Sequence, residues 1–425
     1  MVKYPSMVSA IHWKKRSSKA TRRALGGKRR RKQRRGYSVA PEITFDIIVE
    51  ILRRLPAKSL MRFRCVSKLW SGLIRSRYFC NAYLTKKISL SPPSMGEPVF
   101  LYKRYNFVTH FTHHGSVDFT TSQLLSLTLS SAIDSDESSL EPDLVFPSKE
   151  AKGVHGMMSL RGLILYNFRR KACIYNPTTR QSLTLPAVKS NICAQQELRR
   201  YKHLYFFGYD PVLDQYKIVC NVFERWITSE FWVFVLEPGG FWKRIEDDDQ
   251  PHIPTGEVLC INGVIYYRVF NHTCFDAVYC FDVRSEKFRV VKTPPHAVSQ
   301  FGQSVGFIEH GGKPALFDYT HIRETGVSEL WILEDGLVGT WSRKTLVLKP
   351  CQKHLVGDII MGSRVHGTGQ NNEVILRLSR PSYLLYYHLI ENDLREVNII
   401  REKPNEYVKV VKVMDKCESI IHLET

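Results

Sequence analysis

Apolar and charged positions between Asp46 and Leu55 repeat with the period of an α-helix. Read at about 100° per residue, the charged side chains fall within one arc and the apolar ones take the opposite side. The charged set is Asp46, Glu50, Arg53 and Arg54, and the apolar set is Ile47, Ile48, Ile51, Leu52 and Leu55. Thr44 is expected to cap this helix, and Pro56 to end it by disfavouring helical geometry at the preceding residue. The pattern predicts one amphipathic helix of about eleven residues.

A second apolar stripe follows Pro56 at steps of three and four residues. Its members are Leu60, Phe63, Val66, Trp70, Leu73 and Ile74, with an interruption near Ser67. Two or three short helices bury too little surface to hide both stripes, so other residues must cover them. The stripes could pack on the rest of this chain or bind a separate partner.

From Gly153 onward, short apolar runs alternate with turn residues, which is typical of β-strands. The recurring unit has two inner strands, a third with an aromatic core position, a polar turn and an outer strand. It returns at irregular intervals of about 45 to 60 residues. This repetition predicts a kelch-like β-propeller, because radial repetition leaves only short, protected strand edges. A pair of β-sandwiches is the alternative.

The chain has 425 residues, enough for a small module and a larger domain with a substantial core. It lacks a run of about eighteen apolar residues that could span a bilayer, and its N-terminus lacks the apolar core of a signal peptide. The ten cysteines are therefore expected to be mostly reduced thiols. We expect the protein in the nucleus, the cytoplasm or both, with no membrane partner.

The net charge of +20 is concentrated at the N-terminus. Residues 1–41 hold fourteen Lys and Arg and no Asp or Glu, which leaves +6 on the rest of the chain. Self-repulsion in two basic clusters between Lys14 and Arg35 predicts a disordered tail over residues 1–37. Such a tail could act in nuclear import or contact phosphate backbones. A nucleic-acid-binding protein that uses this tail is therefore an alternative function.

No motif in the sequence predicts an enzyme, a cofactor site or a metal site. Cys260, His272, Cys274 and Cys280 match no zinc-ligand spacing, and small buried thiols are common. No local signature marks a catalytic cysteine. Gly367-Thr368-Gly369 lacks the third glycine of a dinucleotide fingerprint and predicts a turn. A carbohydrate-binding or hydrolytic propeller stays open, and it would need carboxylates and aromatic side chains that converge on one face.

The helical stretch resembles an F-box of the plant type. It reads PEITFDIIVEILRRLPAKSLMRFRCVSKLWSGLIRSRYF from Pro41 to Phe79, with about twenty motif positions in register. The family usually opens with Leu-Pro, whereas this chain has Ala40-Pro41, so one apolar contact is expected to be weaker. The resemblance implies that the F-box helices bind the Skp adaptor of a cullin-RING ubiquitin ligase.

The β-region resembles the plant F-box-associated domain between about residues 155 and 345. The residues that carry the resemblance are Gly162-Leu163-Ile164, Ile174 to Arg180, Phe207 to Pro211, Asp214 to Lys217, Cys260 to Tyr266, Phe281 to Phe288 and Glu329 to Leu333. It implies a kelch-like domain that binds a target protein. The expected fold is an α+β multidomain chain: a basic tail (residues 1–37), a helical F-box module (38–83) and an all-β domain (84–425).

Together the two resemblances imply a non-catalytic substrate-recognition subunit of an SCF-type ubiquitin ligase. Its partners would be a Skp-type adaptor, through it a cullin and a RING protein, and an unknown target. Apolar docking on the adaptor is predicted for Pro41, Ile43, Ile47, Ile51, Leu52, Leu55, Pro56, Leu60, Val66 and Trp70. No catalytic, cofactor-binding or metal-binding residue is predicted.

Overall fold

A computed structural model describes the chain from Ile43 to Leu423, with gaps. The described residues are 43–90, 99–106, 119–128, 139–146, 154–194, 202–224, 228–246, 253–270, 277–294, 304–359, 365–368, 372–376, 383–398, 407–415 and 417–423. The chain divides into two compact units, Met1–Phe45 and Asp46–Thr425, and the contacts below lie within the second. The predicted basic tail lies outside the described residues. Within them, no helix is both long and apolar enough to cross a bilayer.

The described chain opens with helices α1 (Phe45–Arg54), α2 (Ala57–Phe63), α3 (Lys68–Arg75) and α4 (Arg77–Leu90). The predicted interruption at Ser67 is confirmed, because the Ser67 hydroxyl caps α3 by accepting the Trp70 N–H at 3.1 Å. Pro56 directly precedes α2 in extended geometry. Helix α4 continues through position 83, where we predicted the boundary of the β-domain, so the strands begin later, at Val99.

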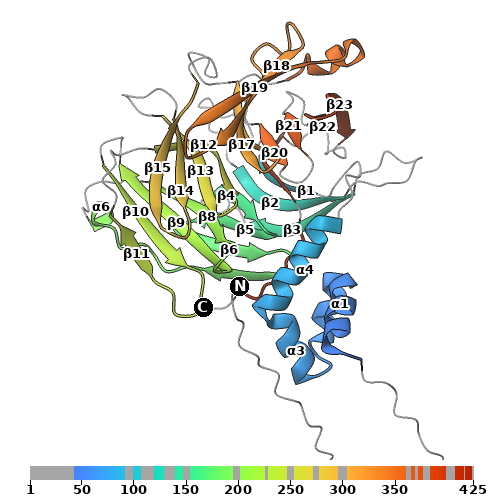
Figure 1. The fold of residues 1–425 in the computed structure, drawn as a ribbon, viewed down its shortest axis with the longest axis vertical. Helices are drawn as coiled ribbons and strands as arrows, with labels where there is room; N and C mark the ends of the chain where they lie inside the picture. The colour runs from blue at the N-terminus through green and yellow to red at the C-terminus, as the bar shows by residue number, and fades with distance from the viewer. Residues whose placement is uncertain are drawn as a thin grey trace, which may run out of the picture. The chain divides into compact units, whose positions relative to one another are not determined.

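The strands of the described residues form six four-stranded antiparallel sheets (Figure 1). From inner to outer strand, the first sheet is β4 (Val154–Leu160), β5 (Leu163–Phe168), β6 (Lys171–Asn176) and β7 (Gln181–Thr184). The second is β8 (Lys202–Asp210), β9 (Gln215–Glu224), β10 (Thr228–Val235) and β11 (Trp242–Ile245). The third is β12 (Ile253–Ile261), β13 (Val264–Phe270), β14 (Ala277–Asp282) and β15 (Lys287–Lys292). The other three are β16 (Val305–His310), β17 (Lys313–Asp318), β18 (Val327–Asp335), β19 (Thr340–Val347); β20 (His366–Thr368), β21 (Glu373–Leu376), β22 (Tyr383–His388), β23 (Asp393–Asn398); and β24 (Tyr407–Asp415), β1 (Val99–Asn106), β2 (Phe119–Thr128), β3 (Ser139–Phe146). Two short helices, α6 (Asn191–Ala194) and the 3₁₀ helix η1 (Pro350–Val356), lie in connections between sheets.

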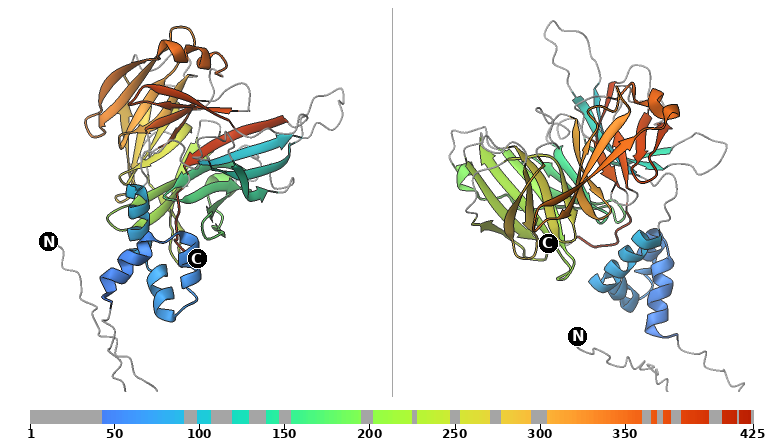
Figure 2. Two further views of the ribbon diagram at one scale, coloured as in Figure 1. Left: turned by 90° about the vertical axis from the view of Figure 1, so that its right-hand side faces the viewer. Right: turned by 45° about the horizontal axis from the view of Figure 1, so that its top comes forward.

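The six sheets close into a ring. Their inner strands contact one another in the order β4, β8, β12, β16, β20, β24, and β24 returns to β4. The last sheet joins the two ends of the domain, because β24 pairs with β1 from Val99 opposite Asp415 to Asn106 opposite Tyr407 (Figure 2). The predicted β-propeller is confirmed, and the pair of β-sandwiches is excluded.

The hydrophobic core lies between neighbouring sheets. Successive side chains of a strand point to opposite faces, and strand β9 shows the result. Ile218 and Cys220 pack with Leu165 of the preceding sheet, whereas Val219 packs with Tyr267 of the following one. A strand buried on both faces reads as a continuous apolar run, which is why these strands were visible in the sequence.

Turns with a carboxylate or amide at their first residue recur on one face of the propeller. In each, the side-chain oxygen accepts backbone N–H bonds two or three residues ahead, and the turn closes with a residue at positive φ. The pairs of first and last residues are Asn176 and Arg180, Asp210 and Asp214, Asp282 and Glu286, and Asp335 and Gly339. These turns explain the Asn-Pro and Asp-Pro dipeptides of the sequence.

Tryptophans at the start of outer strands join one sheet to the next. The Trp242 indole donates to the Pro186 carbonyl at 2.7 Å, and the Trp341 indole donates to the Lys292 carbonyl at 3.0 Å. Both acceptors lie at or just beyond the end of the preceding outer strand. Most tryptophans were predicted to be core, and Trp331 is buried, while Trp242 and Trp341 are partly buried and carry these bonds. Trp226 lies outside the described residues.

His203 of β8 is a titratable group enclosed between two sheets. Its backbone carbonyl accepts a bond from the Asn167 amide at 3.1 Å, and its ring stacks on Tyr205. Burial, with a smaller contribution from the Arg170 charge, lowers the pKa of His203 to about 4. The folded protein therefore holds this imidazole neutral across the pH range in which the unfolded chain protonates it.

We expect His203 to make folding stability depend on pH between about 6.5 and 4. The pKa of His203 is lower in the folded protein than in the unfolded chain. Its contribution to folding stability is therefore complete above pH 6.5 and decreases as the pH falls toward 4, because in that range only the unfolded chain takes up the proton. The slope for one proton approaches about 1.4 kcal/mol per pH unit. Urea unfolding at several pH values should show a smaller slope for His203→Gln than for the wild type, and equal slopes would contradict this role.

Candidate functional site: a helical module with an exposed apolar surface

Helices α1 to α4 form a small module with its own core. Buried residues from all four helices pack together: Val49 and Leu52 of α1, Ala57 and Leu60 of α2, Ile74 of α3, and Phe79, Cys80 and Tyr83 of α4. Ile420, from the C-terminal end of the chain, joins the same cluster. Part of each predicted apolar stripe is therefore covered by this chain itself.

Helix α1 places part of its charged side against α4. The Arg53 guanidinium donates to the Ala82 carbonyl at 3.0 Å, and Glu50 forms an ion pair with Lys86. The hydrogen bond from Lys86 is the largest cause that lowers the pKa of Glu50. Two of the four charged residues that we predicted on one arc thus contact another helix.

Large apolar side chains are exposed on the module. Val66 is 64% exposed, Ile47 is 53% exposed and Ile51 is 49% exposed. Leu69 of α3 and Tyr78 of α4 are also exposed. We call these five residues the apolar surface of the module. Several exposed large apolar side chains on so small a module favour a site for a protein partner.

The structure separates the ten predicted docking residues into groups. Ile43, Ile47, Ile51, Pro56 and Val66 are exposed, and Leu55 and Trp70 are partly buried. Leu52 and Leu60, in contrast, lie in the core of the module at 1% and 0% exposure, so they cannot contact a partner directly. Pro41 lies outside the described residues. A helical period places a residue on a side of a helix, but it does not tell which side the neighbouring helices cover.

Sequence reasoning missed three exposed apolar residues: Phe45, Leu69 and Tyr78. Leu69 lies in α3, beyond the break at Ser67, so the helical period that leads to Val66 does not extend to it. Trp70 was selected instead, and it packs its ring against Phe63 at a centroid distance of 5.4 Å. Phe45 is adjacent to Thr44, the expected cap, and was not among the apolar residues selected for the helix.

The helical module contacts the propeller through polar side chains. Arg161, in the turn between β4 and β5, donates to the Asn81 amide oxygen of α4 at 3.2 Å and to the Tyr216 hydroxyl at 3.2 Å. Its guanidinium also lies over the Tyr209 ring, 4.0 Å from the centroid. The Arg161 backbone has a φ of 50°, a left-handed conformation that is strained for a side chain of this size. One arginine thus joins the module to two sheets.

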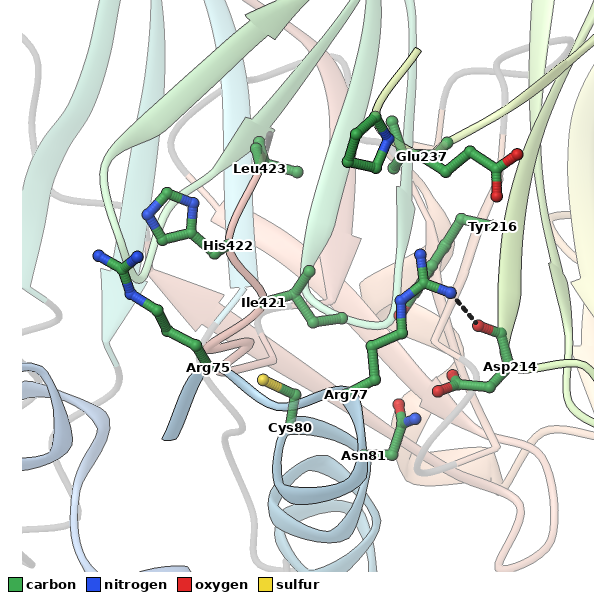
Figure 3. Close-up of a pocket in the computed structure, with 12 residues that line it drawn as sticks. Arg75, Arg77, Cys80, Asn81, Asp214, Tyr216, Glu237, Ile421, His422 and Leu423 are labelled. Atoms are coloured by element: carbon green, nitrogen blue, oxygen red, sulfur yellow. Dashed lines mark hydrogen bonds between the residues drawn. The ribbon is translucent and has the colours of Figure 1, made fainter. Parts of the chain in front are cut away.

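A pocket of about 310 Å³ lies beside this contact (Figure 3). Arg77 of α4 donates to the Asp214 carbonyl at 3.3 Å across it. Its lining combines basic and acidic side chains over an apolar floor: Arg75, Arg77 and His422; Asp214 and Glu237; and Leu236, Pro238, Ile421 and Leu423. Because the charges of the lining are mixed, we interpret the pocket as a gap in the contact between module and propeller.

Cys280 is a buried thiol of the propeller, and Cys260 is a partly buried one. Burial raises the pKa of Cys260 and of Cys280 to about 12, so both stay protonated. Among the described residues, no group of three or more His, Cys, Asp or Glu is placed to hold a metal ion. His272 and Cys274 lie outside the described residues.

Several of the more buried carboxylates are held by cations. Asp210 accepts two bonds from Arg284 at 3.0 and 3.1 Å, and these bonds are the largest cause that lowers the pKa of Asp210. Burial opposes the shift at Glu286, but bonds from Lys217 and Lys243 lower its pKa below the usual value. A glycosidase needs one carboxyl group with a raised pKa, so these two carboxylates are suited to structural ion pairs.

Comparison with known proteins agrees with this architecture. Residues 42–81 match the family described as F-box domain, and residues 107–422 match the family described as F-box associated beta propeller domain. The chain therefore belongs to the F-box proteins that carry an F-box associated β-propeller, as both resemblances in the sequence indicated.

Its relatives include several Arabidopsis thaliana proteins. The putative F-box protein At5g62660 is 52% identical over 392 residues, which cover 90% of this chain and 97% of that protein. The F-box/kelch-repeat protein At4g19930 is 33% identical over 441 residues, covering 96% of this chain and 97% of that protein. A solved structure, TolB from Acinetobacter baumannii, covers 78% of this chain and 72% of its own at 10% identity, and its TM-score of 0.43 is too low to support an argument.

We expect Leu52 and Ile47 to respond differently to truncation. Leu52→Ala should lower the stability of the module by about 2–5 kcal/mol because it leaves a cavity in the core, whereas Ile47→Ala should change it by less than about 0.5 kcal/mol. Native-state hydrogen exchange at the amides of α1 to α4 measures both effects. Equal losses would show that Ile47 is part of the core and not of the apolar surface.

Proposed function

We propose that this protein is the substrate-recognition subunit of an SCF-type ubiquitin ligase. The helical module binds a Skp-type adaptor and, through it, a cullin and a RING protein. The propeller binds a target protein. The subunit itself is non-catalytic: it holds the target close to activated ubiquitin, and proximity raises the effective concentration of the reactants.

One observation carries this proposal. Helix α1 directs Glu50 and Arg53 toward α4, and it leaves Ile47 and Ile51 exposed. If the outer side of α1 faced only water, its isoleucines would point into the core of the module and its charged side chains would point into solvent. The exposed isoleucines therefore favour an apolar partner, as the membership in the F-box family also does.

The placement of the residues refines the predicted docking set. Ile43 and the apolar surface of the module would contact the adaptor directly. Leu55, Pro56 and Trp70 would contribute at its edge, while Leu52 and Leu60 would support the helices from inside. Pro41, and the weaker contact expected from Ala40, stay predictions.

The alternative, a nucleic-acid-binding protein, has less support than the ligase subunit, because it rests on the basic tail alone. Without the fourteen basic residues of positions 1–41, the chain carries only +6, and the F-box and propeller families together account for most of its length. We infer that the tail serves nuclear import, and that the protein acts in the nucleus, the cytoplasm or both.

Val66→Asp should abolish adaptor binding. The substitution places a charge in an apolar interface without a partner, which should weaken the complex at least about a hundredfold. Titration of the purified full chain with the adaptor measures the effect. Val338→Asp is the matched control, because Val338 is a 74% exposed valine in the turn between β18 and β19 of the propeller. Undiminished binding by Val66→Asp would contradict the assignment of the surface.

Target proteins should be retained by the variant that has lost the adaptor. With the proteasome blocked, affinity purification of the wild type should recover adaptor and target, whereas Val66→Asp should recover the target alone. The separation follows if module and propeller bind different partners. Recovery that disappeared after nuclease treatment would instead support the nucleic-acid-binding alternative.

A further inference from the structure

The residues after the last strand, Cys417–Leu423, connect the propeller to the helical module. We call them the C-terminal segment. Ser419 is 1% exposed and Ile420 is 2% exposed, so both side chains are enclosed by the elements around them.

One side of the C-terminal segment is fixed to the sheet β4 to β7. The Ser419 N–H donates to the Thr178 hydroxyl at 3.1 Å, and the Asn176 amide donates to the Ile421 carbonyl at 2.7 Å. The Leu423 N–H donates to the Gln181 side-chain oxygen at 3.2 Å. All three partners come from the turn between β6 and β7 or from the residues that flank it. The side chain of Leu423 is buried in the core of this sheet and its neighbour β8 to β11.

Gly162 lets the segment approach the sheet closely. A Cβ atom at Gly162 would lie 2.6 Å from the Cys417 carbonyl oxygen and 2.8 Å from the Ser419 Cβ, closer than such atoms pack. Gly162 also has a φ of 78°, which favours glycine. The turn between β4 and β5 is thus shaped to receive the segment.

The other side of the C-terminal segment enters the helical module. Ile420 packs in the core with residues of all four helices. The Tyr83 hydroxyl of α4 donates to the Glu418 carboxylate at 2.8 Å, and the Cys80 thiol lies 3.8 Å from the Ile420 carbonyl oxygen. Burial is the first cause that raises the pKa of Tyr83, and the Glu418 charge adds to it, so the phenol remains a donor at all physiological pH values.

We propose that the C-terminal segment is a fifth element of the adaptor-binding module and that Ile420 is a positioning residue for adaptor binding. This inference rests on the proposed function. Four short helices bury little apolar surface, and Ile420 adds a buried side chain to their shared core. The segment follows β24, which closes the propeller ring, so the module receives its last core residue only when the ring is closed. Adaptor binding therefore depends on a complete, folded chain.

The test removes and returns the segment. A chain that ends at Asp415 should bind the adaptor at least about tenfold more weakly than the full chain, because the module core is left with a cavity. A peptide of residues 416–425 added in trans should restore the binding. The same peptide with Ile420→Asp should not restore it, because a charge cannot enter the core without a partner. Restoration by both peptides, or full affinity of the shortened chain, would overturn the proposal.

A milder pair of variants covers the case in which the shortened chain does not fold. Ile420→Ala in the full chain should weaken adaptor binding about tenfold and leave the thermal unfolding of the propeller unchanged. Ile390→Ala is the matched control, because Ile390 is 58% exposed in the turn between β22 and β23. Equal affinities for the two variants would contradict a positioning role for Ile420.

Hydrogen exchange separates this inference from the proposed function. If the wild-type chain does not bind the adaptor, the proposed function fails, but the role of the segment in the module can still be measured. The amides of α1 to α4 should exchange faster in Ile420→Ala than in Ile390→Ala. Unchanged exchange in these helices would overturn the structural part of the inference.

Discussion

The pairing of β24 with β1 is the constraint on which the rest of the structure depends. It joins strands from opposite ends of the domain, and it completes a ring whose inner strands each contact two neighbours. Strand β9 buries side chains against both neighbouring sheets, and an open ring would leave such apolar faces in water. Loop closure over so long a chain is costly in entropy, and the gain comes only when the last strand is in place. Late closure is therefore built into the topology.

Ring closure also sets the position of the residues that follow β24. Because β24 lies at the inner edge of its sheet, the residues after it emerge beside β4, which β24 contacts. From there a few residues reach both the turn between β6 and β7 and the core of the helical module. The polar contacts of Arg161 with Asn81 and Tyr216 hold the same region from the propeller side. The helical module and the propeller are thus linked by two sets of contacts, one from the residues after β24 and one from Arg161.

The sequence predicted the class of each domain because both depend on short-range patterns. The helical period of α1, the interruption near Ser67 and the apolar run of strand β9 are all visible within ten residues. The division of the apolar stripe between core and surface was not predictable, since it depends on α4 and on Ile420, which lies far away in sequence. The helical period assigned Leu52 and Ile51 to the same apolar side, although Leu52 is buried in the core of the module and Ile51 is exposed. Long-range contacts, not local propensity, decide such pairs.

The turns with positive φ on the face that meets the module have a further meaning. Glycine would adopt these conformations without strain, yet Arg161, Asp214 and Glu286 occupy three of them. Each side chain makes a contact that glycine could not. Arg161 donates a hydrogen bond to Asn81 of α4, the Asp214 carboxylate accepts one from the Tyr209 hydroxyl, and Glu286 forms ion pairs with two lysines. A substitution to glycine at any of the three positions would relieve the backbone strain but remove the contact that the side chain makes. At Arg161 the strained conformation therefore accompanies a contact with the module, and at Asp214 and Glu286 it accompanies contacts within the propeller.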